Sequence, residues 1–298
     1  GGVGWAGRAL EWVAPAASLG EFWIKIGLVC LCADVNTIAQ VGLRGLLVAL
    51  GVPPLVLLFG YFLGSKLLKD KTRLAFTISA GIAVCGASAC TAAAAAVGAS
   101  KAELTLSIAI VSLFSLLFLL SEPYAAMGMG LSDEVAGAWI GGSVDLTGGV
   151  VAGAAVVSAR CEEVAAIIKM TQNSALGVYV LFIAFIASRT GLDTSASADD
   201  GLWYGLWKKF PKFVLGYLFC SLVASSLADA ERGTAVSLLA GTVRWWFAIG
   251  FSGLGLSTSF RSLREQLEGP NLLIHYFGLQ MFDVVLTLAV AYLAFAVI

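Results

Sequence analysis

The stretch GGSVDLTGGVVAG, from Gly141 to Gly153, lies within a long apolar part of the chain. It contains five glycines, one serine, one threonine and a single carboxylate, Asp145. Glycine permits backbone conformations outside the helix, and small residues allow helices to approach closely. The stretch is therefore either a tight packing seam with one unusual charge or a binding site within a membrane helix.

The composition is that of a polytopic membrane protein. Hydrophobic residues make up 59% of the chain, charged residues make up 12%, and the mean hydropathy is +0.91. Soluble domains keep roughly a quarter of their residues charged. The low charged fraction therefore predicts a lipid bilayer as surroundings, and the net charge of −1, without a long charged run, predicts no nucleic-acid partner.

Metal sites, cofactors and enzymatic chemistry are not expected. The chain has one histidine, His275, and its six cysteines form no paired C-x-x-C array with histidines. One histidine cannot supply the nucleophile, base and orienting group of a covalent catalyst. The cysteines are expected to be small buried side chains.

Nine apolar segments are long enough to be candidate membrane helices, since a span needs about 20 mostly apolar residues. Residues 1–20 contain a short, charged segment with two tryptophans and are expected to lie at the membrane interface. No second domain is expected within residues 1–298. The candidate helices are 21–35, 41–64, 74–97, 101–122, 131–157, 161–188, 211–228, 234–258 and 271–297.

Three of these helices contain glycine-rich stretches that predict interruptions: Gly81–Ala89, Gly141–Gly153 and Gly250–Ser259. The first and last of these stretches lie five helices apart. Transporters built from two inverted five-helix repeats place an interrupted helix at the same position in each half. The spacing therefore predicts a bile-acid symporter-like or sodium–proton antiporter-like fold of nine to ten helices with discontinuous crossing helices. The first helix of such a fold would be missing or reduced.

Several blocks of the sequence resemble those of the YeiH-like family, to which sulfate export is ascribed. SAGIAVCGASACTAAAAAV (Ser79–Val97) is similar to the family's Cys-Gly-Ala-Ser-Ala block. AIIKMTQ (Ala166–Gln172) resembles its Val-Lys-Leu-Thr-Arg block, and GLGLSTSFRSLRE (Gly253–Glu265) resembles its Leu-Gly-Leu-Gly-Thr-Asn-Leu block. The resemblance covers most of the chain from about residue 22 and includes KIGLVCLCADVNTIAQVGLRGLL.

The resemblance implies a secondary transporter, often dimeric, for sulfate or a sulfonate-derived anion. Where the family reads Gly-Ala-Ser-x-His-Asp-Thr-x-Gln-Val, this chain keeps Ser143 and Thr147 but has only Asp145 in place of the His–Asp pair. Gly149 replaces the glutamine of this block, and Gln172 replaces the arginine of the lysine block. The substrate or its coupling therefore differs from that of relatives, or transport has been lost.

Asp145 and Lys169 are the candidate coupling residues. A carboxylate near the bilayer centre costs about 2.5–3.5 kcal/mol, so Asp145 needs either a partner or a role in proton or sodium coupling. The alternative is a structural pair of Asp145 with Lys169. Lys169 could supply positive charge to an anion, or it could extend toward the lipid headgroups.

The candidate anion site lies at the interruptions, because the start of a half-helix offers unpaired N–H groups and a positive dipole end. The alternative is close packing of small residues. The residues of this site are Gly86, Ala87, Ser88, Ser143, Thr147, Ser257 and Thr258.

The sequence therefore predicts an integral protein of the plasma, inner or an organellar membrane that exports a small anion, with transport coupled to protons or sodium. A homodimer or a membrane-complex partner is expected. The alternative is a transport-inactive relative that serves as a structural subunit of a larger membrane assembly. Flux measurements on the Asp145→Asn variant distinguish the two.

Overall fold

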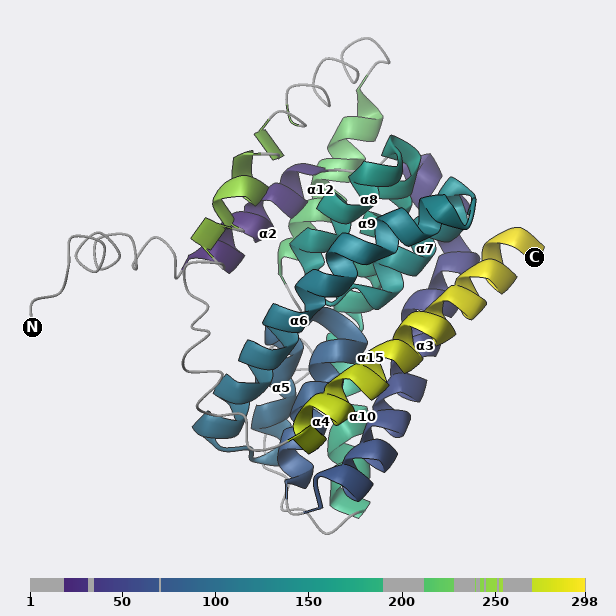
Figure 1. Cartoon of the computed structure of the whole chain (residues 1–298). Coiled ribbons are helices and arrows are strands. Elements are labelled where there is room, and N and C mark those ends of the chain that lie inside the picture. The colour runs from purple at the N-terminus through teal and green to yellow at the C-terminus, as the bar shows by residue number, and fades with distance from the viewer. Residues whose placement is uncertain are drawn as a thin grey trace, which may run out of the picture. The chain divides into compact units, whose positions relative to one another are not determined.

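In the computed structural model, all regular secondary structure of the described residues is helical, and these residues contain no strand (Figure 1). Two compact units can be distinguished, residues 1–38 with 212–262 and residues 39–211 with 263–298. The described residues are 19–31, 35–69, 71–189, 212–227, 239, 242–243, 245–250, 252–253 and 270–297.

The first unit is built on two helices, α2 (Gly20–Leu31) and α12 (Phe213–Ser226). They pack closely, since a Cβ added at Gly216 would lie 2.9 Å from a methyl carbon of Val29. The ring of Trp23 stacks on that of Trp246, with 5.3 Å between the ring centroids. Apolar and aromatic contacts therefore hold this unit together.

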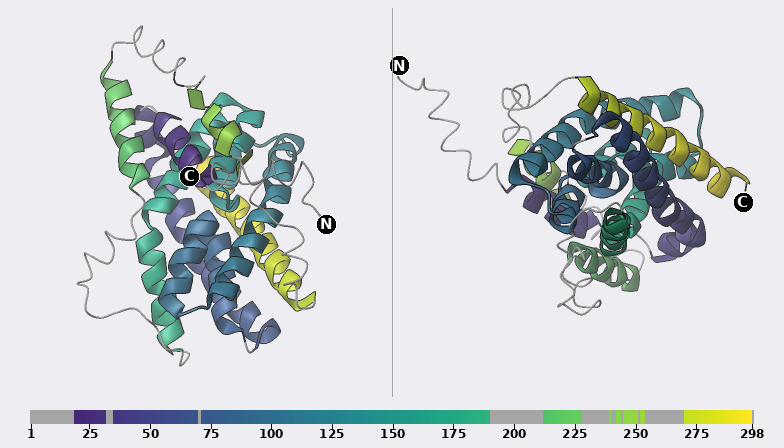
Figure 2. Two further views of the ribbon diagram at one scale, coloured as in Figure 1. Left: turned by 90° about the vertical axis from the view of Figure 1, so that its left-hand side faces the viewer. Right: turned by 90° about the horizontal axis from the view of Figure 1, so that it is seen from below.

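The second unit contains the remaining helices. Helices α3 and α15 run side by side in both Figure 1 and Figure 2, and the rings of Phe59 and Phe282 stack between them at 4.1 Å. Helix α3 is kinked at Gly42. The helices are α3 (Val35–Leu67), α4 (Thr72–Ala80), the π-helix η1 (Gly81–Cys85), α5 (Ala87–Val97), α6 (Lys101–Gly128), α7 (Asp133–Ser143), α8 (Thr147–Val157), α9 (Ala159–Ser174), α10 (Leu176–Arg189), α15 (Pro270–Tyr292) and the π-helix η2 (Leu293–Val297).

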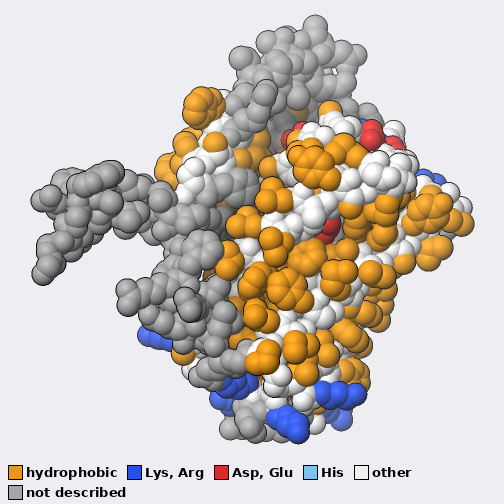
Figure 3. Space-filling model, in the orientation of Figure 1, with side chains coloured by type: hydrophobic (Ala, Val, Ile, Leu, Met, Phe, Trp, Pro, Cys, Tyr) orange, Lys and Arg blue, Asp and Glu red, His pale blue; other side chains and the backbone are white. Residues whose placement is uncertain are grey.

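The outer faces of these helices are suited to lipid. Phe62 is 60% exposed, Leu120 65% and Val285 61%. Figure 3 shows a broad band of hydrophobic side chains, with Lys and Arg gathered at one end of it. Three stretches, 38–67, 101–128 and 270–297, are long and apolar enough to cross a membrane, and the bent pair α9–α10 would be a fourth. The predicted all-helical membrane protein is confirmed at this level; the larger count of nine to ten spans stays a prediction.

The helices are interrupted in two of the three glycine-rich stretches. The segment 72–97 is divided at Gly86, and the segment 133–157 is divided at residues 144–146. The third stretch, Gly250–Ser259, lies mostly outside the described residues. The candidate span 161–188 is formed by two helices, α9 and α10, which meet at an angle of 49° around Ala175. Gly177 lies two residues after Ala175, in the first turn of α10, and no proline lies near the bend.

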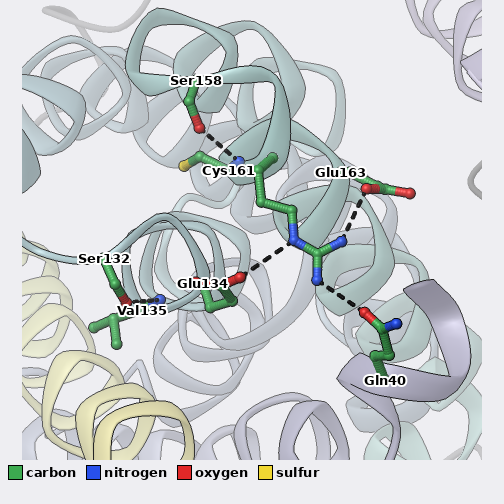
Figure 4. A network of polar contacts seen from close by, with 8 residues as sticks. Gln40, Ser132, Glu134, Val135, Ser158, Cys161 and Glu163 are labelled. Atoms are coloured by element: carbon green, nitrogen blue, oxygen red, sulfur yellow. Dashed lines mark hydrogen bonds and ion pairs between the residues drawn. The ribbon is translucent and has the colours of Figure 1, made fainter.

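Helices α7 and α9 begin side by side, and serine side chains cap both N-termini (Figure 4). The hydroxyl of Ser132 accepts from the N–H of Val135 at 3.4 Å, and that of Ser158 accepts from the N–H of Cys161 at 3.0 Å. Arg160 links the two helices through Glu134 at 3.3 Å. It also contacts Glu163 on α9 and Gln40 on α3. These contacts set the register of α7 against α9.

The same two helices then pack through glycines. A Cβ added at Gly137 would lie 2.7 Å from the carbonyl oxygen of Cys161, and one at Gly141 would lie 2.8 Å from that of Ala165. On α8, Gly149 and Gly153 face Leu119 of α6 in the same way, at 3.0 and 2.9 Å. The glycines of the stretch 141–153 therefore form a packing seam on both sides of its break.

We expect Gly141→Ala to destabilise the protein by about 1–3 kcal/mol, because the added methyl group overlaps backbone atoms of α9 that cannot turn away. The matched control is Gly51→Ala, where a Cβ would meet no atom within 4 Å. That change should be neutral or stabilise by about 0.5–1 kcal/mol through helix propensity. Thermal denaturation in detergent measures both variants. Equal midpoints would contradict the packing seam.

Candidate functional site

The first helix break lies at Gly86, between η1 and α5. Gly86 has φ +63°, which side chains disfavour, and its N–H donates to the carbonyl oxygen of Gly81 at 2.9 Å. The π-helical turn before it shifts the hydrogen-bonding pattern by one residue. The carbonyl groups of the last residues before the break therefore need donors from elsewhere in the protein.

The second helix break covers Val144–Leu146, between α7 and α8. Val144 and Leu146 have extended backbone angles, and Asp145 lies between them with only 1% of its surface exposed. The two breaks are neighbours in space, since a Cβ added at Gly86 would lie 3.2 Å from the carbonyl oxygen of Asp145. Two glycine-rich stretches about 60 residues apart in the sequence thus meet at one point.

Polar side chains from α9 donate to the carbonyl groups that the first break leaves free. The ammonium group of Lys169 donates to the carbonyl oxygen of Val84 at 2.9 Å, and the amide of Gln172 donates to that of Ala83 at 3.0 Å. Lys169 also donates to the Gln172 side-chain oxygen. A cation is favourable at the C-terminal end of a helix, where the dipole is negative. Lys169 therefore stabilises the broken end of the α4–η1 segment.

The second break is capped in the same manner. The Gln172 amide also lies 3.2 Å from the carbonyl oxygen of Gly142, and the amide of Gln280 on α15 donates to the carbonyl oxygen of Ser143 at 3.1 Å. Since Gln172 reaches both Ala83 and Gly142, one side chain bridges the two breaks. Its position on α9 is the one where the resembled family has arginine.

The helix halves that follow the breaks begin without side-chain caps. Neither α5 nor α8 has a capping hydrogen bond from its N-cap residue. Ser88 is exposed at the start of α5, with its hydroxyl 2.8 Å from the sulfur of Cys85, and Ala87 is half-buried. Thr147 begins α8 and accepts from the amide of Asn173 at 3.4 Å. The first turns of both helices therefore offer N–H groups to an acceptor.

Three buried carboxyl groups surround the breaks, and each has one hydroxyl partner. Asp145 lies 2.8 Å from Ser115, Glu122 lies 2.6 Å from Ser143, and Asp283 lies 2.9 Å from Thr287. All three residues are at most 2% exposed. In the described part of the chain, the other oxygen of each group has no hydrogen-bond partner.

Lys169 is the positive charge that faces this cluster. It is 1% exposed, which excludes the prediction that it extends toward the headgroups. Within the described ranges no carboxylate lies within 4.0 Å of its ammonium group, so the alternative of a direct Asp145–Lys169 ion pair is not observed. The charges of Asp145, Asp283 and Glu122 nevertheless act on Lys169 from a longer distance.

The structure thus brings five predicted site residues to the breaks: Gly86, Ser143, Asp145, Thr147 and Lys169. Ala87 and Ser88 follow in the first turn of α5. Ser257 and Thr258 lie outside the described residues. No group of three or more His, Cys, Asp or Glu side chains that could hold a metal ion is found among the residues described.

Sequence reasoning missed Ser115, Glu122, Gln280 and Asp283. Glu122 is the last residue of the predicted helix 101–122, whereas α6 continues to Gly128. Asp283 lies within the predicted helix 271–297, for which no site residue is predicted. An ionisable residue inside an apolar helix is by default a candidate functional residue, and that rule would have identified both carboxylates.

The comparisons with known proteins identify one family. The family described as Conserved hypothetical protein 698 matches residues 14–274. A UPF0324 membrane protein of Rhodopirellula baltica is 38% identical over 97% of this chain and 54% of its own length. One of Nitratidesulfovibrio vulgaris is 36% identical over 97% of this chain and 52% of its own length. No solved structure matches.

The chain spans about half the length of these curated relatives. A UPF0324 membrane protein of Bordetella bronchiseptica is 30% identical over 84% of this chain and 76% of its own length. The resemblance to the YeiH-like family, drawn from the order of a few sequence blocks, is confirmed by these matches. This chain is an integral membrane protein that belongs to the UPF0324 family.

Proposed function

We propose that this chain contains the transport site of a secondary active transporter for a small anion, such as sulfate or a sulfonate-derived anion. The observation that carries the proposal is the meeting of two helix breaks inside the protein, at Gly86 and Asp145, with their free carbonyl groups capped by α9 and α15. Interrupted helices at membrane depth are characteristic of substrate and ion sites in secondary transporters.

The anion is assigned to the uncapped starts of α5 and α8. Their N–H groups and positive dipole ends favour a negative ligand, with Gly86, Ala87, Ser88 and Thr147 beside it. Asp145 and Lys169 are assigned to coupling with protons or sodium. Ser143, the last residue of α7 before the second break, is assigned to the anion site as well.

The finer features of the fold belong to the same proposal. We assign nine to ten membrane helices in two inverted repeats, with Ser257 and Thr258 contributing to the site from the second half. Movement of one helix bundle against the other would expose the site to each side of the membrane in turn. A homodimer is the expected assembly. No cofactor and no enzymatic reaction are assigned.

A structural subunit of a larger membrane assembly is the second candidate function. Two observations favour it: the close packing of Gly137, Gly141, Gly149 and Gly153, and the 1% exposure of Asp145. Both also fit a transporter in a closed conformation, in which the site is open to neither side. The direct pair of Asp145 with Lys169 that a purely structural role would favour is not observed among the described residues.

Anion flux in proteoliposomes tests the proposal. Purified full-length protein should transport at least one of sulfate, sulfite and a sulfonate, with a rate that depends on pH. Asp145→Asn should reduce this flux at least tenfold, because the amide keeps the shape and the acceptor for Ser115 but cannot exchange a cation.

The matched control is Asp133→Asn, which makes the same change at the partly exposed start of α7. It should keep the flux of the unmodified protein. If well-folded protein moves none of the three anions under a proton or a sodium gradient, the structural-subunit function is favoured instead. Equal flux in both variants would remove Asp145 from the coupling site.

A further inference from the structure

The three buried carboxyl groups differ in how their hydroxyl partners are placed. Ser115 donates to Asp145 at 2.8 Å and Thr287 donates to Asp283 at 2.9 Å. Ser143 has two oxygen neighbours, the Glu122 carboxyl oxygen Oε2 at 2.6 Å and the carbonyl oxygen of Trp139 at 2.8 Å. Of the three carboxyl groups, Glu122 is thus the one whose hydroxyl partner also lies within hydrogen-bonding distance of a backbone carbonyl oxygen.

A hydroxyl group carries one hydrogen and can complete both contacts only if one neighbour donates to it. The carbonyl group of Trp139 cannot donate. If Ser143 donates to Trp139, the short contact to Glu122 is a hydrogen bond only when Glu122 itself carries a proton on Oε2. The geometry around Ser143 thus fits a carboxylic acid at position 122.

The surrounding charges point in the same direction. Glu122, on α6, faces the charges of Asp283 on α15, Asp145 in the second break and Lys169 on α9. With every group ionised, three buried negative charges would face one positive charge, which is unfavourable away from water. A proton on Glu122 reduces this excess. It also makes the unpartnered Oε1 a neutral carbonyl oxygen, which is less costly to bury than a carboxylate oxygen.

We propose that Glu122, hydrogen-bonded to Ser143, is a proton-binding site, and that the proton is the coupling ion of the proposed transporter. The coupling assignment rests on the proposed function; the protonation of Glu122 does not. On loading, an O–H bond forms at Oε2 of Glu122 as one breaks in hydronium or a buffer acid. On release, that bond breaks and the proton returns to water. The Ser143 hydroxyl then turns from Trp139 to Glu122 and stabilises the carboxylate.

Infrared spectroscopy of the full-length protein in lipid tests this site directly. The unmodified protein should show the C=O stretch of a protonated carboxylic acid, shifted in D₂O and lost at high pH. Glu122→Gln should lose this band. Glu103→Gln on the same helix, where glutamine keeps the capping box with Ser100, is the matched control and should retain it.

Ser143→Ala supplies a second readout if Glu122→Gln does not fold. It keeps the carboxylic acid but removes its acceptor, so the band should persist at a higher wavenumber. The site at Glu122 is overturned if no protonated-acid band occurs at any pH, if the band persists unchanged in Glu122→Gln, or if Asp145→Asn removes it instead.

Flux separates this inference from the function on which its coupling part rests. In the unmodified protein, anion flux should be driven by a proton gradient, and Glu122→Gln should make the flux insensitive to that gradient. This result supports both the transport function and the coupling role of Glu122. If the infrared band is assigned to Glu122 but no anion is transported, the proton-binding site is supported and the proposed transport function is overturned. If anion flux is driven by a sodium gradient alone, the proposed transport function is supported, and the proposal that the proton is the coupling ion is overturned.

Discussion

Lys169→Met is expected to destabilise the protein by about 3–5 kcal/mol, the usual cost of removing one member of a buried charged group. Methionine fills a similar volume, but it cannot donate to the carbonyl oxygen of Val84 or to the side-chain oxygen of Gln172. It also leaves the carboxyl groups of Asp145, Asp283 and Glu122 without the positive charge that faces them. Thermal denaturation in detergent, followed by size-exclusion chromatography, measures the loss of folded protein.

The matched control is Lys101→Met, which makes the same change at the exposed first residue of α6. Exposed charges contribute about 0–1 kcal/mol, so this variant should unfold at nearly the same temperature as the unmodified protein. A small effect at both positions would show that Lys169 does not hold the broken end of the α4–η1 segment.

Gln172→Leu should also reduce stability strongly, because one amide serves both breaks. Its loss leaves the carbonyl oxygens of Ala83 and Gly142 without this donor, at a cost of about 1–3 kcal/mol for each buried group. Leucine has a similar size, so the effect reports the hydrogen bonds more than the packing. The same denaturation measurement, with hydrogen exchange of the amides around residues 83–90 and 142–149, checks the result.

Gln40→Leu is the corresponding control, since Gln40 is exposed and contacts Arg160 at 3.3 Å. It should change the free energy of unfolding by less than about 1 kcal/mol. Faster exchange at both breaks in Gln172→Leu, and at neither break in Gln40→Leu, is the expected pattern. Faster exchange at only one break would contradict the bridging role.

Asp145, Lys169 and the glycine-rich stretches could be identified from the sequence because their signals are local. A charge inside an apolar run, or a cluster of glycines inside a helix-length segment, stands out without any knowledge of the fold. The stretch Gly141–Gly153 contains both a packing seam and a helix break. The glycines at 137, 141, 149 and 153 pack against neighbouring helices, while residues 144–146 form a break that contains a buried carboxylate.

Other parts of the site could not be predicted from local patterns. The bend of 49° at Ala175 is marked only by a single glycine, Gly177, and an isolated glycine in a helical pattern is usually tolerated without a break. Gln172 and Gln280 are unremarkable as residues, because a glutamine in a helix gains a role only when free carbonyl groups lie beside it. Those carbonyl groups belong to segments that are 30 to 137 residues away in the sequence.

The sequence by itself determined the class of this protein, an all-helical integral membrane protein, because hydrophobic composition and the length of apolar segments decide solvation by lipid. It also determined where two helices break, since glycine-rich stretches favour interruption locally. Only the tertiary structure decided that the breaks at Gly86 and Asp145 meet and that Glu122 and Asp283 face the same cluster. The physical reason is that free backbone groups and buried charges must find partners through space, and the sequence order does not specify those partners.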